Sequence, residues 1–415
     1  MATEAPPAPA GPAHVAVVSF LAARAAPTGG FWIALAGGVA LARLAQRRGA
    51  RLGFGASVAA MLETVAIIGP ARFGIPLTQA ATAPLLGRLE ARGVGVALQV
   101  PACAAIRLLH NSATTAFFIW IVTGGLDAYA GTYDSLGRRV GIEIGTSDAL
   151  VLTAAGLLAW AVFASVMQVL VYRRGLREWD ATARRLDEGA ASGGAEAAPA
   201  ALGRASRSRR FDPRAITLAA AVAFALLLTS TDWLLLAAVS LWLAVAWALS
   251  QGDRGPVATG LLFAAILAAG AFLFTLGGGL GIEEALRRAA RAALLVLVAT
   301  WLRAAAGADG LREVARRGLG RLRGVPPAPE AAEVLDGIAS EGRLAAAART
   351  LAGELGAVRM RPLPVLDAVL GWVVREAAAF RPAPPRPRAA ALAAGPFDWL
   401  LVLFAAAPAL APGAG

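Results

Sequence analysis

Residues 148–172 read DALVLTAAGLLAWAVFASVMQVLVY, a run in which Asp148 is the only charged residue. About 20 apolar residues in an α-helix are enough to cross the hydrocarbon core of a bilayer. Backbone polar groups inside that core must find partners within the protein, so only helices and closed barrels span it. The length of this run and its lack of alternation predict a membrane-spanning helix.

Apolar blocks of the same kind recur along the 415 residues. Hydrophobic residues make up 58% of the chain and charged residues only 16%, against about 25% in soluble domains. We therefore predict an all-α, polytopic membrane protein with about 10–12 apolar helices, plus amphipathic helices on the cytoplasmic side; the alternative is an unusually alanine-rich soluble protein. The blocks lie at 14–26, 30–47, 53–69, 74–89, 94–110, 111–125, 148–172, 215–230, 232–249, 257–276, 283–306 and 397–410.

A polar stretch at 173–209 separates the blocks into two groups and ends in an arginine cluster that includes Arg204 and Arg209. Short arginine-rich loops stay on the cytoplasmic side of membrane proteins. We therefore predict four parts, namely a disordered tail at 1–13, an N-terminal membrane domain at 14–172, a cytoplasmic linker at 173–209 and a second membrane domain at 210–415.

All 39 basic residues are arginine, and the net charge is +12. Without lysine the chain cannot form a Walker A phosphate loop or a Schiff base, so ATP-driven work needs a partner that hydrolyses ATP. The arginines stand in short clusters between apolar blocks, which indicates membrane topology rather than nucleic-acid binding. One cysteine, Cys103, and two histidines predict no disulfide framework, no metal centre and no cofactor.

Residues 309–388 differ in character, because charged residues recur every three or four positions among alanine and leucine. This pattern is typical of amphipathic helices that lie on a membrane or pack on a partner. Prolines at 326–327 and 362–364 divide the stretch into about three helices. We expect a cytoplasmic docking arm. The alternative is a set of interfacial helices that only holds the bundle at the membrane.

Four motifs follow one another in the second half: Arg210-Phe211-Asp212-Pro213-Arg214, Gly281-Ile282-Glu283-Glu284-Ala285-Leu286, Ala306-Gly307-Ala308-Asp309-Gly310-Leu311 and Phe397-Asp398-Trp399-Leu400. In this order and spacing, residues 204–415 resemble the transmembrane coupling (T) component of energy-coupling factor transporters. That family opens with a hydrophobic-Asp-Pro-Arg motif before its first span. The first half has the size and hydrophobicity of the substrate-binding (S) subunits of these transporters, so an S-like unit is expected there by analogy.

The resemblance implies two cytoplasmic coupling helices whose arginines insert into paired ATPase subunits. The nearest matches are Ala348-Arg349-Thr350 and Phe380-Arg381-Pro382, and both lack the glycine of the family motif. Arginine suits such a contact because its guanidinium holds a carboxylate through two hydrogen bonds. Arg349 and Arg381 are therefore the candidate ATPase-coupling residues. The alternative is that they are ordinary solvated arginines on helices.

Ionisable side chains inside apolar blocks cost roughly 2.5–3.5 kcal/mol on insertion scales and are functional candidates by default. Four stand out in the first half: Glu63, Arg72, Arg107 and His110. A pair of Glu63 with Arg107 or Arg72 would neutralise both charges and could also bind a zwitterionic or anionic solute. Because both arginines lie near block ends, snorkelling to lipid headgroups is the alternative.

Two smaller features carry weaker expectations. Thr78 and Gln79 are expected to pack between helices rather than to bind a ligand. The slightly acidic segment 126–147 is expected to be an outside loop, in which Tyr129 and Asp134 could form part of a lid.

The leading hypothesis is the coupling subunit of an energy-coupling factor-type ABC importer for a vitamin, a cofactor precursor or a metal ion, in a bacterial inner membrane. Its expected partners are ABC-type ATPase subunits, the lipid bilayer and a possible separate substrate-binding membrane subunit, and not nucleic acid. A non-catalytic scaffold derived from the same family is one alternative. A membrane enzyme acting on lipid or polyprenyl substrates is another, but it would need Asp-rich or His-rich clusters that the sequence lacks. We therefore expect no enzymatic activity.

Overall fold

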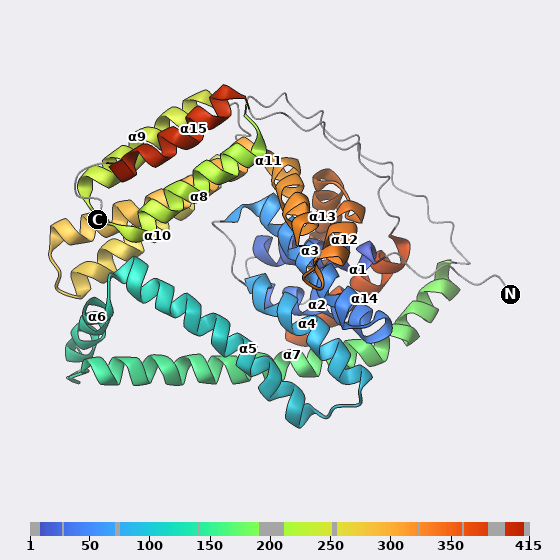
Figure 1. Ribbon diagram of the computed structural model, residues 1–415. Helices are drawn as coiled ribbons and strands as arrows, with labels where there is room; N and C mark the ends of the chain where they lie inside the picture. The colour runs from blue at the N-terminus through green and yellow to red at the C-terminus, as the bar shows by residue number, and fades with distance from the viewer. Residues whose placement is uncertain are drawn as a thin grey trace.

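The computed structural model describes residues 9–26, 29–70, 75–139, 141–190, 211–250, 255–322, 324–358, 361–380 and 395–410. All regular structure in these residues is helical, as the apolar blocks predict (Figure 1). Five helices are long and apolar enough to cross a membrane. The chain is an all-α, polytopic membrane protein.

The five candidate spans carry the longest apolar runs. They are α3 (Ala50–Ile68), α5 (Val96–Phe117) continued by the π-helical turn η2 (Phe118–Thr123), α7 (Thr146–Ala190), α10 (Gly255–Gly277) and α11 (Ile282–Arg321). Large apolar side chains remain on the outside of α5, α7 and α10, for example Leu109, Trp160 and Leu273. Lipid tails are as apolar as leucine, so this exposure is favourable in a bilayer and marks the lipid-facing surface.

The larger hydrophobic core joins helices from the first half of the chain with helices from the second half. Around it pack α1 (Ala10–Ala25), α2 (Gly30–Arg48), α3 and α4 (Ile75–Ala91), together with α12 (Ala328–Gly337), α13 (Glu341–Gly356) and α14 (Pro362–Ala379). The orange helices α12 and α13 accordingly lie among the blue helices in Figure 1. α13 turns Leu344, Leu351 and Leu355 into this core, at the spacing of one helical face.

This packing differs from the docking arm expected at 309–388. The apolar faces of α12–α14 are covered by α1, α2 and α3, so they are not free to lie on a membrane or a partner. Amphipathic periodicity predicts that a helix buries one face, but it does not identify the covering element. What remains accessible is the polar face of these helices.

Several helix boundaries also differ from expectation. α1 begins at Ala10, inside the expected tail, and α7 runs on to Ala190, through much of the expected linker. The segment expected as an outside loop contains α6 (Leu126–Arg139). Residues such as Ala, Arg, Glu and Leu favour helix regardless of whether the surroundings are apolar, so a helix continues beyond the apolar run that predicts it.

A second core lies at the other side of the molecule. It is built by α8 (Pro213–Thr229), α9 (Trp233–Leu249), the first part of α11, and α15 (Pro396–Ala406) with the short 3-10 turn η3 (Ala407–Leu410). The rings of Trp242 and Trp301 meet edge to face within it, with centroids 5.2 Å apart.

α11 is the element that both cores share. Its residues between Leu294 and Ala306 belong to the second core, whereas Leu319 belongs to the first. Between them the backbone breaks at Gly307, with φ 65° and ψ 166°. Only glycine adopts this region readily, so the predicted turn at 306–311 is a sharp bend within one long helix.

Candidate functional site

Charged side chains gather at one end of the first bundle, where the last turn of α2, the first turn of α3, the end of α4 and residues 173–184 of α7 come together. We call this region the arginine-rich end. Ion pairs connect its helices: Arg43 and Arg47 with Asp180, Arg51 with Glu330, Arg173 with Glu90, and Arg174 with Asp367. The arginine clusters that follow α2 and the apolar run of α7 in the sequence are therefore close together in space.

A buried ion pair connects the two halves of the chain. Glu63, in the middle of α3, is fully buried, and both of its carboxylate oxygens accept hydrogen bonds from the guanidinium of Arg312 on α11. Arg312 also donates to the backbone carbonyl of Ala339, 3.3 Å away. A two-point contact of this kind fixes orientation as well as distance.

A second arginine of α11 reinforces this junction. Arg303 Nε donates to the carbonyl of Ile67, 2.7 Å away, and its Nη2 donates to Glu341 at 2.9 Å. Ile67 belongs to the last turn of α3, whose carbonyls have no partner within the helix. Gly69 follows there with φ +85°, and a Cβ on it would lie 3.2 Å from Arg303 Cβ. Arg303 therefore caps α3 and holds it beside the bend at Gly307.

These contacts correct the expected pairing of Glu63. Its partner is Arg312 of the second half, and not Arg107. α3 packs against α11 and α12, whereas Arg107 lies on α5, which contacts α4 and α7. Arg72, the other expected partner, lies outside the described residues.

Arg107 belongs to a separate buried network. Its Nη2 donates to Gln168 Oε1 on α7 at 2.6 Å, and its Nη1 lies 3.5 Å from Thr78 Oγ1 on α4. Gln168 Nε2 donates in turn to Thr82 Oγ1 at 2.8 Å, and that hydroxyl donates to the carbonyl of Thr78. Three helices, α4, α5 and α7, therefore share one chain of hydrogen bonds at membrane depth.

The network leaves the charge of Arg107 without a carboxylate partner in the described part of the chain. Only 5% of this residue is exposed, and its Nε makes no hydrogen bond. The guanidinium points to α4 and α7, and it does not reach towards the lipid headgroups as the snorkelling alternative expects. A buried cation with an unused donor is suited to receive a carboxylate or a phosphate.

The other predicted residues near Arg107 behave differently. His110 is half-buried, one turn farther along α5. Thr78 takes part in the network, whereas the side chain of Gln79 is fully buried and makes no hydrogen bond. Unsatisfied buried amides are rare in native proteins. After Arg107 Nε on α5, the side chain of Gln79 on α4 is therefore a second buried polar group without a hydrogen bond.

Arg349 is exposed on the outer face of α13, opposite the leucines that enter the core. Its Nε donates to the carbonyl of Ala345, 3.2 Å away, and small residues surround it on this face, among them Ala352 and Gly353. The guanidinium is accessible to another protein. Arg381 lies outside the described residues.

Two motifs that are far apart in the sequence meet at the start of α8. Asp212 caps this helix by accepting from Arg214 N, and its carboxylate also binds the Arg214 guanidinium. Asp212 N in turn donates to Asp398 Oδ1 of α15 at 2.8 Å. The hydrogen bonds from Arg214 hold the pKa of Asp212 below its ordinary value. The Asp-Pro-Arg motif thus ties the first and last helices of the second half together.

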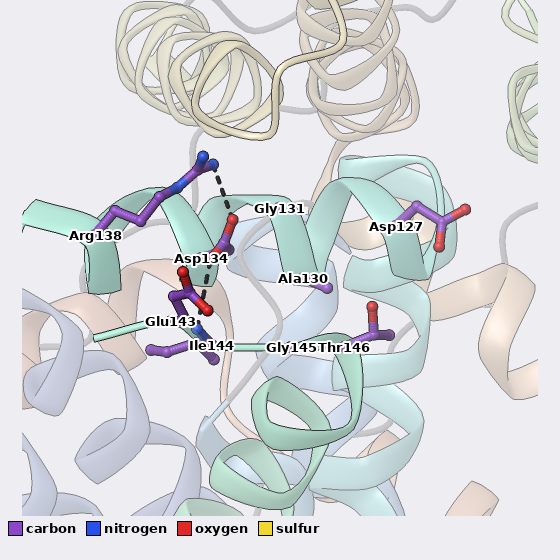
Figure 2. Close-up of a pocket in the computed structure, with 9 residues that line it drawn as sticks. All are labelled: Asp127, Ala130, Gly131, Asp134, Arg138, Glu143, Ile144, Gly145 and Thr146. Atoms are coloured by element: carbon purple, nitrogen blue, oxygen red, sulfur yellow. Dashed lines mark hydrogen bonds and ion pairs between the residues drawn. The ribbon is translucent and has the colours of Figure 1, made fainter. Parts of the chain in front are cut away.

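The N-terminal end of α7, away from the arginine-rich end, borders a hollow of about 480 Å³, shown in Figure 2. Its polar walls come from α6 and the connection that follows, with Asp127, Asp134, Arg138 and Glu143. Asp134 pairs with Arg138 at 2.8 Å and accepts from the backbone N–H of Ile144 (Figure 2). Asp134 therefore fastens the end of α6 and is not a free lid residue.

Arg303, Arg312 and Gln168 are the site residues that the sequence analysis did not single out. Gln168 stands inside the clearest apolar run, and a polar residue there is a usable signal. Arg303 ends the apolar run of the block 283–306, so the same signal was available for it. Arg312 lies in an arginine-rich stretch, where nothing in the local sequence separates a buried arginine from a solvated one.

No family model, curated protein or solved structure matches this chain.

Proposed function

We propose that this chain is the membrane-embedded coupling subunit of an energy-coupling factor-type ABC importer for a micronutrient. The observation that carries the proposal is the junction of Glu63, Arg303 and Arg312, through which the helices that resemble a coupling arm are fastened to the N-terminal bundle. A displacement of α12–α14 would pass directly into α1 and α3, because these helices share one core.

The distribution of charge supports the orientation that this function needs. By the positive-inside rule, the arginine-rich end faces the cytoplasm. The proposal places α13 on the same side, where the exposed guanidinium of Arg349 can bind a carboxylate of an ATPase. The hollow beside α6 would face the outside, because the apolar run of α7 that separates the two ends is roughly 36 Å long.

The test is co-purification with ABC-type ATPase subunits from the same genome, co-expressed with the full chain in mild detergent. We expect a stoichiometric complex that Arg349→Ala weakens about 30-fold, as loss of a central interface arginine does. Arg177→Ala is the matched control, because Arg177 is also exposed on a helix and its Nε likewise donates, at 3.2 Å, to a carbonyl four residues earlier. Absence of a complex with the wild-type chain, or equal loss in both variants, would contradict the proposal.

Arg107 narrows the class of substrate. A buried guanidinium attracts carboxylates and phosphates and repels cations, so we propose an anionic vitamin or cofactor precursor rather than a metal ion. In a thermal-shift screen, anionic vitamins should stabilise the wild-type chain and the Arg107→Lys variant, but not Arg107→Gln. Stabilisation by cobalt(II) or nickel(II) ions instead, or anion binding that survives Arg107→Gln, would contradict this assignment.

A scaffold without ATPase partners is the second candidate. It is favoured by Thr350, which stands where the resemblance calls for glycine beside Arg349. The scaffold predicts that wild-type chain binds no ATPase while the substrate screen still gives its result, so the two experiments together separate the candidates.

A further inference from the structure

A cavity of about 320 Å³ lies at the arginine-rich end, between α1, α2, α7 and α14. Its inner wall is apolar, with Leu44 and Val374 buried and the indole of Trp179 half-buried. Three arginines of α2 form its rim: Arg43, Arg47 and Arg48. The cavity therefore combines an apolar interior with a cationic entrance.

The rim has more positive charge than the neighbouring side chains neutralise. Arg43 and Arg47 share a single carboxylate, that of Asp180, and Arg43 also donates to Gln46 Oε1 at 2.8 Å. Arg48 is exposed and forms no ion pair with the described residues. Among the described side chains, three guanidinium groups against one carboxylate leave two positive charges at the entrance.

The position of the cavity along α7 determines what can reach it. The apolar run of α7 ends at Tyr172, and charged residues begin at Arg173. Just before this boundary Leu170 is 51% exposed on the lipid-facing side. Trp179 follows about two turns later, and tryptophan is enriched at the membrane–water interface. The rim therefore lies at the level of lipid headgroups.

We infer that this cavity is a binding site for the headgroup of an anionic phospholipid. Arg47 and Arg48 hold the phosphate, since arginine binds phosphate oxygens through two parallel hydrogen bonds. The glycerol and the first methylenes of the acyl chains pack against Leu44 and Val374. Basic pockets between membrane helices on one face are suited to such headgroups. The bound lipid would join α2, α7 and α14 at the edge of the bundle.

Lipid titration of the delipidated full chain, followed by native mass spectrometry, tests this site. We expect phosphatidylglycerol to bind in preference to phosphatidylcholine, and Arg47→Gln/Arg48→Gln to weaken it about 30-fold, at about 1 kcal/mol for each arginine near the surface. The control is Arg88→Gln/Arg92→Gln, which removes the same charge from the end of α4, outside the cavity.

A second variant tests the apolar wall without changing any charge. Ala183 lines the cavity on α7 and is half-buried, so Ala183→Trp fills the space while the fold is preserved. It should abolish the preference for phosphatidylglycerol, with the melting temperature of the delipidated chain unchanged. Equal weakening by both arginine pairs would indicate general surface attraction, and would overturn the site. Full competition by millimolar inorganic phosphate would show that the lipid chains play no part, and would also overturn the site.

Discussion

The buried arginines of this protein differ in how their charge is compensated. In α11, Arg291 donates to the carbonyls of Leu227 and Leu228 at the end of α8, and Arg303 caps α3 in the same way. Arg303 also pairs with Glu341, and Arg312 pairs with Glu63. Carbonyls at helix ends carry partial negative charge, so both arrangements are favourable. Arg107 has neither a carboxylate nor a helix end among the described residues, which distinguishes it as the candidate ligand-binding arginine.

Glu63→Gln should leave the buried Arg312 with Asp309, 3.7 Å from its Nη1 and largely exposed, as its remaining carboxylate. It should lower the free energy of unfolding by about 3–5 kcal/mol. The exposed pair of Glu283 with Arg287 is the matched control, and Glu283→Gln should cost about 0–1 kcal/mol. Unfolding in detergent measures both. In a double-mutant cycle, Glu63→Gln with Arg312→Met should cost less than the sum of the single changes. Additive costs would show that the pair contributes no coupling.

Asp212 predicts a local pH dependence of stability. Because Arg214 lowers the pKa of Asp212 below its ordinary 3.8, the ionised carboxylate stabilises the fold fully above this value. The contribution is lost as the pH falls through the lowered pKa of the folded state. Asp212→Asn keeps a helix-capping oxygen but removes the charge. The difference in melting temperature between wild type and variant should be constant above about pH 5 and shrink towards pH 3. A constant difference throughout would contradict the role of the charge.

Among the elements, α11 has the greatest consequence for function, because it belongs to both cores and carries both junction arginines. Its bend at Gly307 lies between Arg303 and Arg312, so the backbone angle there sets where the two guanidinium groups reach α3. A straight helix could not satisfy the carbonyl of Ile67 and the carboxylate of Glu63 in the same way.

Gly307→Ala should cost about 1–3 kcal/mol, because an alanine is strained at φ 65° and ψ 166°. Gly318→Ala, in the same helix, should instead stabilise the protein by about 0.5–1 kcal/mol, since Gly318 is helical, exposed and has open space around its Cβ position. Thermal unfolding of the two variants measures the contrast. If Gly307→Ala changed the stability no more than Gly318→Ala does, the surrounding structure would not hold the bend at Gly307.

At the scale of the whole molecule, the two ends of α7 have opposite character. The C-terminal part of α7 belongs to the arginine-rich end and lines the cavity of about 320 Å³ there. Its N-terminal part packs against α6 and borders the hollow of Figure 2. The apolar, outward-facing side chains of α5, α7 and α10 lie between them. This arrangement matches a bilayer with one basic face.

Cysteine labelling in intact cells tests this orientation. In a Cys103→Ala background, a cysteine at Glu143 should react with a membrane-impermeant maleimide, because this exposed residue lies beside the hollow that the proposed topology places outside. A cysteine at Arg184, also exposed but at the arginine-rich end, should react only after the membrane is permeabilised. The reverse pattern would invert the topology and remove Arg349 from the cytoplasm.

The sequence by itself determined the fold class, the apolar runs and the positions where polar residues enter them. Hydrophobic length is a local property, so Asp148–Tyr172 predicts a membrane span before any contact is known. The sequence also drew attention to Glu63 and Arg107, because a charge in an apolar run is costly wherever the helix lies.

Only the tertiary structure decided which partners these residues have. Glu63 meets Arg312, 249 positions along the chain, and the amphipathic α12–α14 are covered by α1–α3. Burial and ion pairing depend on which helices become neighbours, and periodicity within one helix contains no information about that choice. The physical reason is that a helix needs only some apolar surface to cover its face, whereas a buried charge needs one particular atom within hydrogen-bond distance.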